Sequence, residues 1–159
     1  MTSTLRKLAL SAFLSVSALS AVTMTSCNKD PEVCTTGYSG DNCKTVVRTS
    51  YYNSYKGSGV DNSGDTYTDW TAKFTELGTD VTKMNLQLLD NKLASVEALT
   101  VTLTTNTSFN VDQKVDGSIT TTGTGTISPS AVSLTLTQKD VVLGVTTTTT
   151  ITFSNMVKQ

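Results

Sequence analysis

The sequence contains no histidine, and its 159 residues include only one Trp, two Pro and three Cys. The chain therefore lacks the side chain that most often acts as a general acid or base near neutral pH. Its serines and threonines have no evident activating partner. Two pairs of aspartates could act as paired carboxylates. Asp61 and Asp65 flank one predicted turn, and Asp112 and Asp116 lie near another. Aspartate is common in turns, which is sufficient to explain all four. We expect neither catalysis nor a cofactor.

The chain also lacks a strong charge of either sign. It carries 12 basic and 13 acidic residues, and the basic residues form no cluster. A protein of this kind has no electrostatic footprint for nucleic acid and no polybasic patch for anionic lipid head groups. Beyond residue 26 no apolar run reaches the roughly 20 residues of a membrane-spanning helix. We expect no nucleic-acid partner and no helical membrane span.

The first 26 residues have the three parts of a secretory signal. Arg6 and Lys7 precede an apolar stretch over residues 8–22, and small polar residues follow it. This order is typical of a cleavable signal peptide. A spanning helix is the alternative, but four serines interrupt the stretch, which is too short to anchor the chain by itself. We expect residues 1–26 to be removed.

The tetrapeptide Met24-Thr25-Ser26-Cys27 resembles a bacterial lipobox. Ser26 is small, as the position before the cut requires, and Met24 stands where Leu is commonest, a relaxation familiar in lipoproteins of the Bacteroidota. The resemblance implies that Cys27 becomes the mature N-terminus and carries acyl chains such as palmitate, which would anchor it in the outer membrane. The alternative is a secreted protein in which Cys27 is an unpaired thiol.

Residues 27–33 are expected to form a lipidated tether, because this polar, proline-containing run cannot pack into a core. Lys29-Asp30 and Glu32 are similar to the lysine-plus-acid signal that sends Bacteroidota lipoproteins to the cell surface. A solvated spacer explains the same residues without any signal. The predicted location is therefore the bacterial cell envelope, on either face of the outer membrane.

Residues 34–43 form the motif C-x-x-G-Y-x-G-x-x-C, which resembles the last disulfide loop of an EGF-like module. Its glycines permit turn conformations that other residues resist. The resemblance implies a disulfide between Cys34 and Cys43, and an exported pair of thiols left over after acylation of Cys27 should be oxidised. A complete module needs six cysteines, so calcium binding and receptor recognition are not implied. Two cysteines without histidine also cannot complete the usual tetrahedral metal site.

Residues 50–157 are rich in Thr, Val, Leu and Gly, with apolar residues at alternate positions. This period is typical of antiparallel strands with one buried face. It predicts an all-β domain, an antiparallel meander of about eight strands that forms a curled sheet or a small up-and-down barrel. The predicted strands are residues 51–59, 67–77, 82–89, 95–103, 109–116, 118–127, 132–136 and 145–153.

Two segments also fit a helical pattern. Trp70, Phe74 and Leu77 have helical spacing, but the threonines between them lower helix propensity and favour a strand. Apolar residues also have helical spacing over 89–96. We expect a helical turn within residues 92–98.

The succession of lipobox, tether, disulfide loop and β domain resembles a family of Bacteroidota lipoproteins. In that family the Gly-Tyr-x-Gly loop is followed by an arginine and a Tyr-x-Gly strand, matched here by Arg48 and by Tyr55-Lys56-Gly57. The resemblance implies a place at the envelope, and it carries over no activity.

Two non-catalytic roles remain for the β domain. The expected one is a filled scaffold that is structural or binds a protein partner, with a core of Trp70, Phe74, Met84, Phe109 and Phe153. The alternative is a lipocalin-like carrier of a small apolar ligand, with room left by small inward residues, namely Ala72, Gly123 and Gly125. An apolar cavity of roughly 300 Å3 or more would favour the carrier.

Overall fold

The computed structural model describes residues 33–90 and 95–159, with side chains omitted for residues 95–97. The predicted signal peptide, Cys27 and nearly all of the predicted tether lie outside the described residues.

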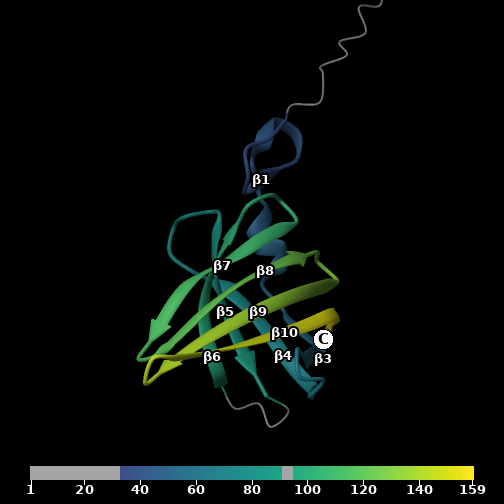
Figure 1. The fold of residues 1–159 in the computed structure, drawn as a ribbon. Coiled ribbons are helices and arrows are strands. Elements are labelled where there is room, and N and C mark those ends of the chain that lie inside the picture. Colours follow the sequence, from purple (N-terminus) through teal and green to yellow (C-terminus); the bar gives the residue numbers. More distant parts are fainter. Residues whose placement is uncertain (1–32, 91–94) are drawn as a thin grey trace, which may run out of the picture. The chain divides into compact units, whose positions relative to one another are not determined.

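Residues 54–158 form a closed antiparallel barrel of eight strands, in which each strand pairs with its neighbours in the sequence and the last pairs with the first (Figure 1). The predicted all-β meander is confirmed, and of the two predicted forms the closed up-and-down barrel is the correct one. The strands are β3 (Ser54–Asp61), β4 (Thr66–Glu76), β5 (Lys83–Leu89), β6 (Ser95–Leu103), β7 (Ser108–Asp116), β8 (Ile119–Ile127), β9 (Ala131–Val142) and β10 (Val145–Lys158).

A small disulfide-bonded loop precedes the barrel. Cys34 and Cys43 are joined, as predicted, and the strands β1 (Tyr38–Ser39) and β2 (Thr45–Val46) pair across the loop. Gly37 and Gly40 both have positive φ angles, which explains glycine at these positions. Two short 3-10 helices, η1 (Asp41–Cys43) and η2 (Val47–Tyr51), were not predicted.

The strand boundaries differ most from prediction in β3, β9 and β10. β9 was predicted over residues 132–136 and spans Ala131–Val142. β3 begins only at Ser54 because the preceding residues form η2, and β10 continues past Phe153 to Lys158. The helical turn expected within residues 92–98 is wrong for residues 95–98, which belong to β6, and residues 92–94 lie outside the described residues. Pairing of β6 with β5 supplies backbone hydrogen bonds that override the local helical pattern.

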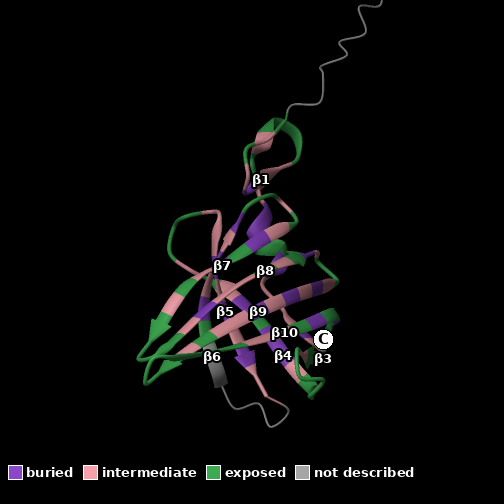
Figure 2. Cartoon of the chain, in the orientation of Figure 1, coloured by how far each residue is buried: buried purple, intermediate pink, exposed green. Residues whose placement is uncertain are grey.

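Buried residues alternate with more exposed ones along the strands (Figure 2), and the buried side chains form one core cluster inside the barrel. Every strand contributes buried side chains: β8 contributes Thr121 and Ile127, each 2% exposed, and the other seven strands contribute side chains that are less exposed still. The largest of these are Tyr55, Phe74, Phe109, Phe153, Met84, Leu86, Leu99, Leu134, Met156, Val101 and Val132. Such dense packing is typical of a protein core and gives the barrel a rigid frame.

Two glycines of β8 lie against this core, and they do not leave the room for a ligand that the carrier alternative assigned to them. A Cβ atom at Gly125 would lie 2.3 Å from Cζ of Phe109, because the phenyl ring packs directly on the glycine backbone. A Cβ atom at Gly123 would lie 2.9 Å from Cδ2 of Leu136. Neighbouring side chains therefore occupy the space that the missing Cβ atoms leave.

Arg48 on η2 closes one end of the barrel. Its side chain is buried, and it donates hydrogen bonds to the backbone carbonyls of three residues in the β4–β5 connection and of Lys83, the first residue of β5. The acceptors are Leu77 at 3.2 Å, Gly78 at 3.0 Å, Asp80 at 2.6 Å and Lys83 at 2.8 Å. One guanidinium group thus binds four carbonyls at once and fixes the connection over the end of the barrel.

Asn106, in the β6–β7 turn, fixes the disulfide loop to the same end. Its Oδ1 accepts the backbone N–H of Gly37 at 2.9 Å, and its Nδ2 donates to the carbonyl of Tyr38 at 2.8 Å. The hydroxyl of Tyr51 donates to the carbonyl of Asn106. This end, which we call the closed end, is therefore covered by η2 and the disulfide loop.

Candidate functional site

An apolar cavity of about 330 Å3 lies at the opposite end of the barrel, which we call the mouth. The β3–β4, β7–β8 and β9–β10 connections lie at the mouth. The volume exceeds the lower limit that is typical of ligand pockets. The lining residues come from β4, β5, β9 and β10, and they are Tyr67, Trp70, Leu88, Leu136, Gln138, Thr149, Ile151 and Phe153.

Three aromatic rings form one wall of the cavity. The rings of Tyr67 and Trp70 meet edge to face, with centroids 5.5 Å apart, and the rings of Trp70 and Phe153 lie 5.7 Å apart. Phe153 is fully buried and forms the floor, whereas Tyr67 and Trp70 are only partly buried. Trp70 is the sole tryptophan of the chain.

A β-bulge at Asp69 brings two of these rings together. Tyr67 and Trp70 are three residues apart, so in a regular strand their side chains would point to opposite faces. Asp69 has a φ of 60°, and the pairing with β3 shifts register at this point, so Gly59 lies opposite Tyr67 and Gly57 opposite Trp70. The extra residue puts both rings inside. The alternation in the sequence predicted that Trp70 points inward, but it did not predict that Tyr67 points inward next to it.

Two polar side chains lie side by side near the outer limit of the cavity. Gln138 on β9 and Thr149 on β10 are directly paired across the two strands. Within the described part of the chain, neither side chain makes a hydrogen bond. An apolar cavity with a few unsatisfied polar groups is the usual form of a small-molecule site.

Asp61 at the end of β3 is held beside the cavity. Its backbone pairs with Ile151, and its carboxylate accepts the backbone N–H groups of Ser63 and Asp65 at 2.8 and 3.0 Å and the hydroxyl of Tyr67 at 3.1 Å. Desolvation opposes ionisation, but the hydrogen bonds outweigh it and hold the pKa of this carboxyl below its ordinary value. Desolvation, followed by the hydrogen bond to Asp61, raises the pKa of the Tyr67 hydroxyl. Asp61 is therefore ionised and Tyr67 neutral at neutral pH.

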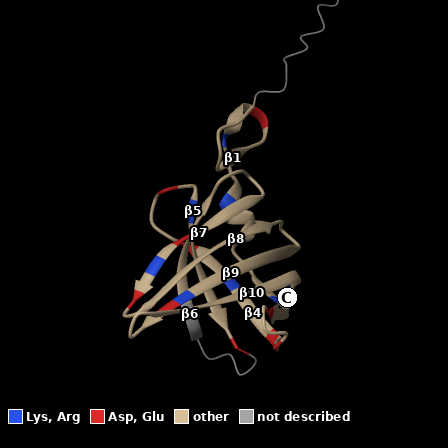
Figure 3. Ribbon diagram, viewed as in Figure 1, with Lys and Arg blue, Asp and Glu red and all other residues tan. Residues whose placement is uncertain are grey.

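Acidic residues occur on the connections around the mouth (Figure 3). Asp61 and Asp65 flank the β3–β4 turn, Asp116 ends β7, and Asp140 lies near the tip of β9. No lysine or arginine lines the cavity. The cavity wall is therefore uncharged, and carboxylates lie near its entrance.

The two hairpins β7–β8 and β9–β10 extend apolar side chains into solvent next to the mouth. Their tips lie side by side, because the backbone N–H of Val141 donates to the carbonyl of Ser118 at 3.2 Å. Leu143 is 99% exposed and has a φ of 51°, and Gly144 follows with a φ of 80°. Such two-residue turns favour Asn-Gly, so leucine is an unfavourable choice there. The exposed apolar side chains are Val115, Ile119, Val141, Val142, Leu143 and Val145.

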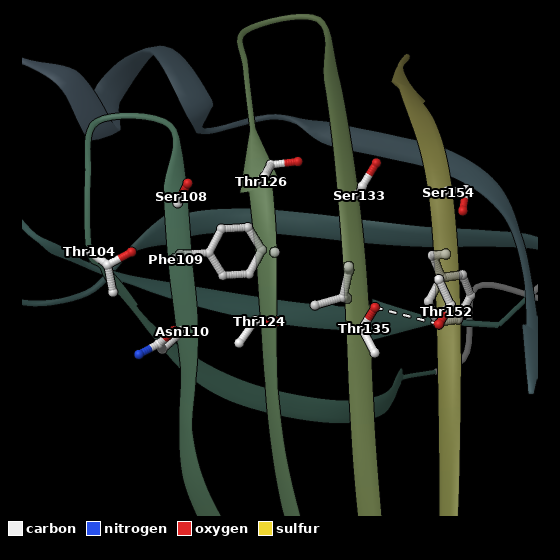
Figure 4. A pocket seen from close by; sticks show the side chains of 13 residues that line it. Thr104, Ser108, Phe109, Asn110, Thr124, Thr126, Ser133, Thr135, Thr152 and Ser154 are labelled. Atoms are coloured by element: carbon white, nitrogen blue, oxygen red, sulfur yellow. Dashed lines mark hydrogen bonds between the residues drawn. The ribbon is translucent and has the colours of Figure 1, made fainter. Parts of the chain in front are cut away.

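A larger hollow of about 410 Å3 lies on the outer face of strands β7 to β10 (Figure 4). Most of its lining residues are serine and threonine, and the hydroxyls of Thr135 and Thr152 are 3.4 Å apart. These outward side chains are partly or wholly exposed, and no apolar wall encloses the space. The mouth cavity, which inward side chains surround, is the stronger candidate despite its smaller volume.

The other predicted residues have structural roles or lie outside the description. Cys34 and Cys43 are consumed in the disulfide, and Cys27 lies outside the described residues. Asp61 and Asp65 form the predicted turn. Among residues 33–90 and 95–159 no cluster of histidine, cysteine, aspartate and glutamate could hold a metal ion.

The described part of the chain has no helix that is long and apolar enough to cross a membrane. Comparison of the chain with family models, with curated proteins and with solved structures found no match. Function must therefore be inferred from the geometry of the site.

Proposed function

We propose that this chain is a non-catalytic binding protein for a small apolar ligand, held at the bacterial outer membrane by a lipid anchor on Cys27. The main observation that supports ligand binding is the apolar cavity of about 330 Å3 at the mouth. Lipocalin-like carriers, which the sequence analysis gave as an alternative to the filled scaffold, hold their ligands at the same place in a barrel.

The contrast between the two ends of the barrel supports this role. At the closed end large side chains fill the interior, so the chain is able to pack a barrel of this size. At the mouth, Trp70 and Ile151 are left only partly buried against empty space. A ligand that covers these apolar surfaces would contribute about 25 cal/mol for each Å2 removed from water.

The neutral dye N-phenyl-1-naphthylamine provides a direct test, because Trp70 is the sole tryptophan and lies in the cavity wall. We expect the dye to bind with one site per chain and to quench Trp70 emission by energy transfer. Thr149→Phe places a ring in the cavity and should weaken binding at least about tenfold, a loss of about 1.4 kcal/mol.

Thr148→Phe is the matched control. It is the same substitution one position earlier, on the opposite face of β10, where the side chain is exposed. Its affinity for the dye should equal that of the unaltered chain. Equal binding by the Thr149 and Thr148 variants would refute the proposed site.

The anchor is supported by the order of signal peptide, lipobox-like Met24-Thr25-Ser26-Cys27 and polar tether. In cells fed a clickable fatty acid, we expect the unaltered chain to be labelled and Cys27→Ala to carry no label. Equal labelling of the two would remove the anchor from the proposal. Protease treatment of intact cells would then distinguish the outer face of the membrane, where the chain is cut, from the inner face.

The apolar hairpin tips favour a second candidate, a structural or partner-binding role. Monomeric proteins rarely keep a cluster of exposed aliphatic side chains without a use for it, and Leu143 occupies a turn position that does not suit leucine. A protein partner would cover these tips. If no apolar probe binds in the cavity, the partner-binding role becomes the better explanation of the barrel.

A further inference from the structure

We propose that the cavity selects an uncharged apolar compound bearing one carbonyl or hydroxyl group, and that it discriminates against anions such as fatty-acid carboxylates. This inference rests on the proposed ligand-binding function and specifies the chemical class of the ligand.

The cavity wall offers nothing that would neutralise an anion. Its eight lining residues include no lysine or arginine. Lys139 follows Gln138 on β9, but the alternation along a strand directs it to the outer face, where it is exposed. Lys56 is paired with Asp69 at 3.1 Å. A carboxylate entering the cavity would lose its hydration and find no cation among the lining side chains, which is unfavourable.

Two carboxylates close to the lining residues also disfavour anions, although Lys139 lies beside one of them on β9. Asp61 is held ionised beside Tyr67 by its hydrogen bonds. Asp140 is two residues beyond Gln138 on β9, so it is on the same face of the strand, one step nearer the tip of the hairpin. An approaching anion meets these negative charges before it reaches the wall.

The polar pair Gln138 and Thr149 determines what the cavity does accept. The amide of Gln138 can donate and accept, and the hydroxyl of Thr149 can do both as well. Neither has a hydrogen-bond partner among the residues that the structure describes. A carbonyl or hydroxyl on the ligand would satisfy them, whereas a pure hydrocarbon would bury them unpaired at a cost. The aromatic wall then receives the apolar body of the ligand.

Two matched pairs of probes test this selectivity at pH 7.5. N-phenyl-1-naphthylamine and 8-anilino-1-naphthalenesulfonate share one ring system and differ by a sulfonate, and decanol and decanoate differ in charge at the head. We expect the neutral dye to bind at least about tenfold more tightly than the sulfonate. Decanol should displace it at a concentration at least about tenfold lower than decanoate does.

Gln138→Lys supplies the missing cation and should raise affinity for the sulfonate and for decanoate at least about tenfold. Thr137→Lys is the matched control, because it adds the same charge on the opposite face of β9 and should leave the preference unchanged. Retained Trp70 emission and far-ultraviolet circular dichroism would show that each variant folds. If Gln138→Lys does not fold, Thr149→Lys places the same charge on the paired strand and should have the same effect.

Equal binding of both members of each pair would overturn this inference and leave the proposed function intact. An equal gain in anion binding from Gln138→Lys and Thr137→Lys would also overturn it, because the effect would then come from net charge. Failure of every probe to bind would instead overturn the proposed function.

Discussion

Gly125→Ala is expected to destabilise the protein by about 3 kcal/mol, although it adds a single methyl group. The new Cβ atom would lie 2.3 Å from Cζ of Phe109 and 2.6 Å from the carbonyl oxygen of Ser133. The ring is enclosed by the core, and the oxygen belongs to the paired strand β9, so neither neighbour can move away easily. Urea unfolding followed by circular dichroism measures the loss.

Gly144→Ala is the comparison for this prediction. Its Cβ atom would meet nothing within 4 Å, but its φ of 80° strains an alanine, so we expect a loss of only about 1 kcal/mol. Combining Gly125→Ala with Phe109→Leu should cost less than the sum of the single changes, because the leucine no longer reaches the added methyl. Strict additivity would show that the ring does not pack on Gly125.

Arg48→Met is expected to cost at least about 3 kcal/mol, since four backbone carbonyls lose a charged hydrogen-bond donor. Arg48 donates to four backbone carbonyls, and its side chain is only 6% exposed. Methionine retains much of the apolar length but supplies no donor. Arg48→Lys should recover only part of the loss, because a single ammonium cannot reproduce the planar fork of the guanidinium. Thermal unfolding of the three proteins provides the comparison.

Glu76→Gln separates the carbonyl contacts from the ion pair. The carboxylate of Glu76 lies 3.3 Å from the Arg48 guanidinium, but its side chain is 69% exposed. Exposed ion pairs contribute about 0 to 1 kcal/mol, so the variant should be nearly as stable as the unaltered chain. A loss as large as that of Arg48→Met would instead assign the stabilising effect of Arg48 to the ion pair.

The strands could be predicted because their alternation is strong. Met84, Leu86 and Leu88, for example, are every second residue, and all three are buried on one side of β5. Closure of the barrel could not be predicted in the same way. It depends on strand number, tilt and register together, and register shifts such as the one in β10 between Phe153 and Val157 leave no clear pattern in the sequence.

The candidate site was harder to predict than the fold. Thr149 belongs to a run of five threonines, residues 146–150. Because both faces of the strand carry the same residue type there, the sequence does not show which threonines point inward. Only its pairing with Gln138 shows that Thr149 faces the cavity and Thr148 faces solvent. Gly123 and Gly125 were ambiguous for a related reason. An inward glycine can leave empty space, or it can allow a neighbouring side chain to pack against the backbone. Phe109 takes the room at Gly125.

The pairing of β10 with β3 has a consequence for the order of folding. Val60 lies opposite Thr152, so nearly the whole barrel sequence separates these partners. Every other barrel pairing joins strands that follow one another directly, and such local pairings form early. Until the last strand arrives, both outer strands have unpaired edges that can join other chains. Closure is therefore expected to be the slow step, and the interval before it is when the chain is most exposed to misassembly.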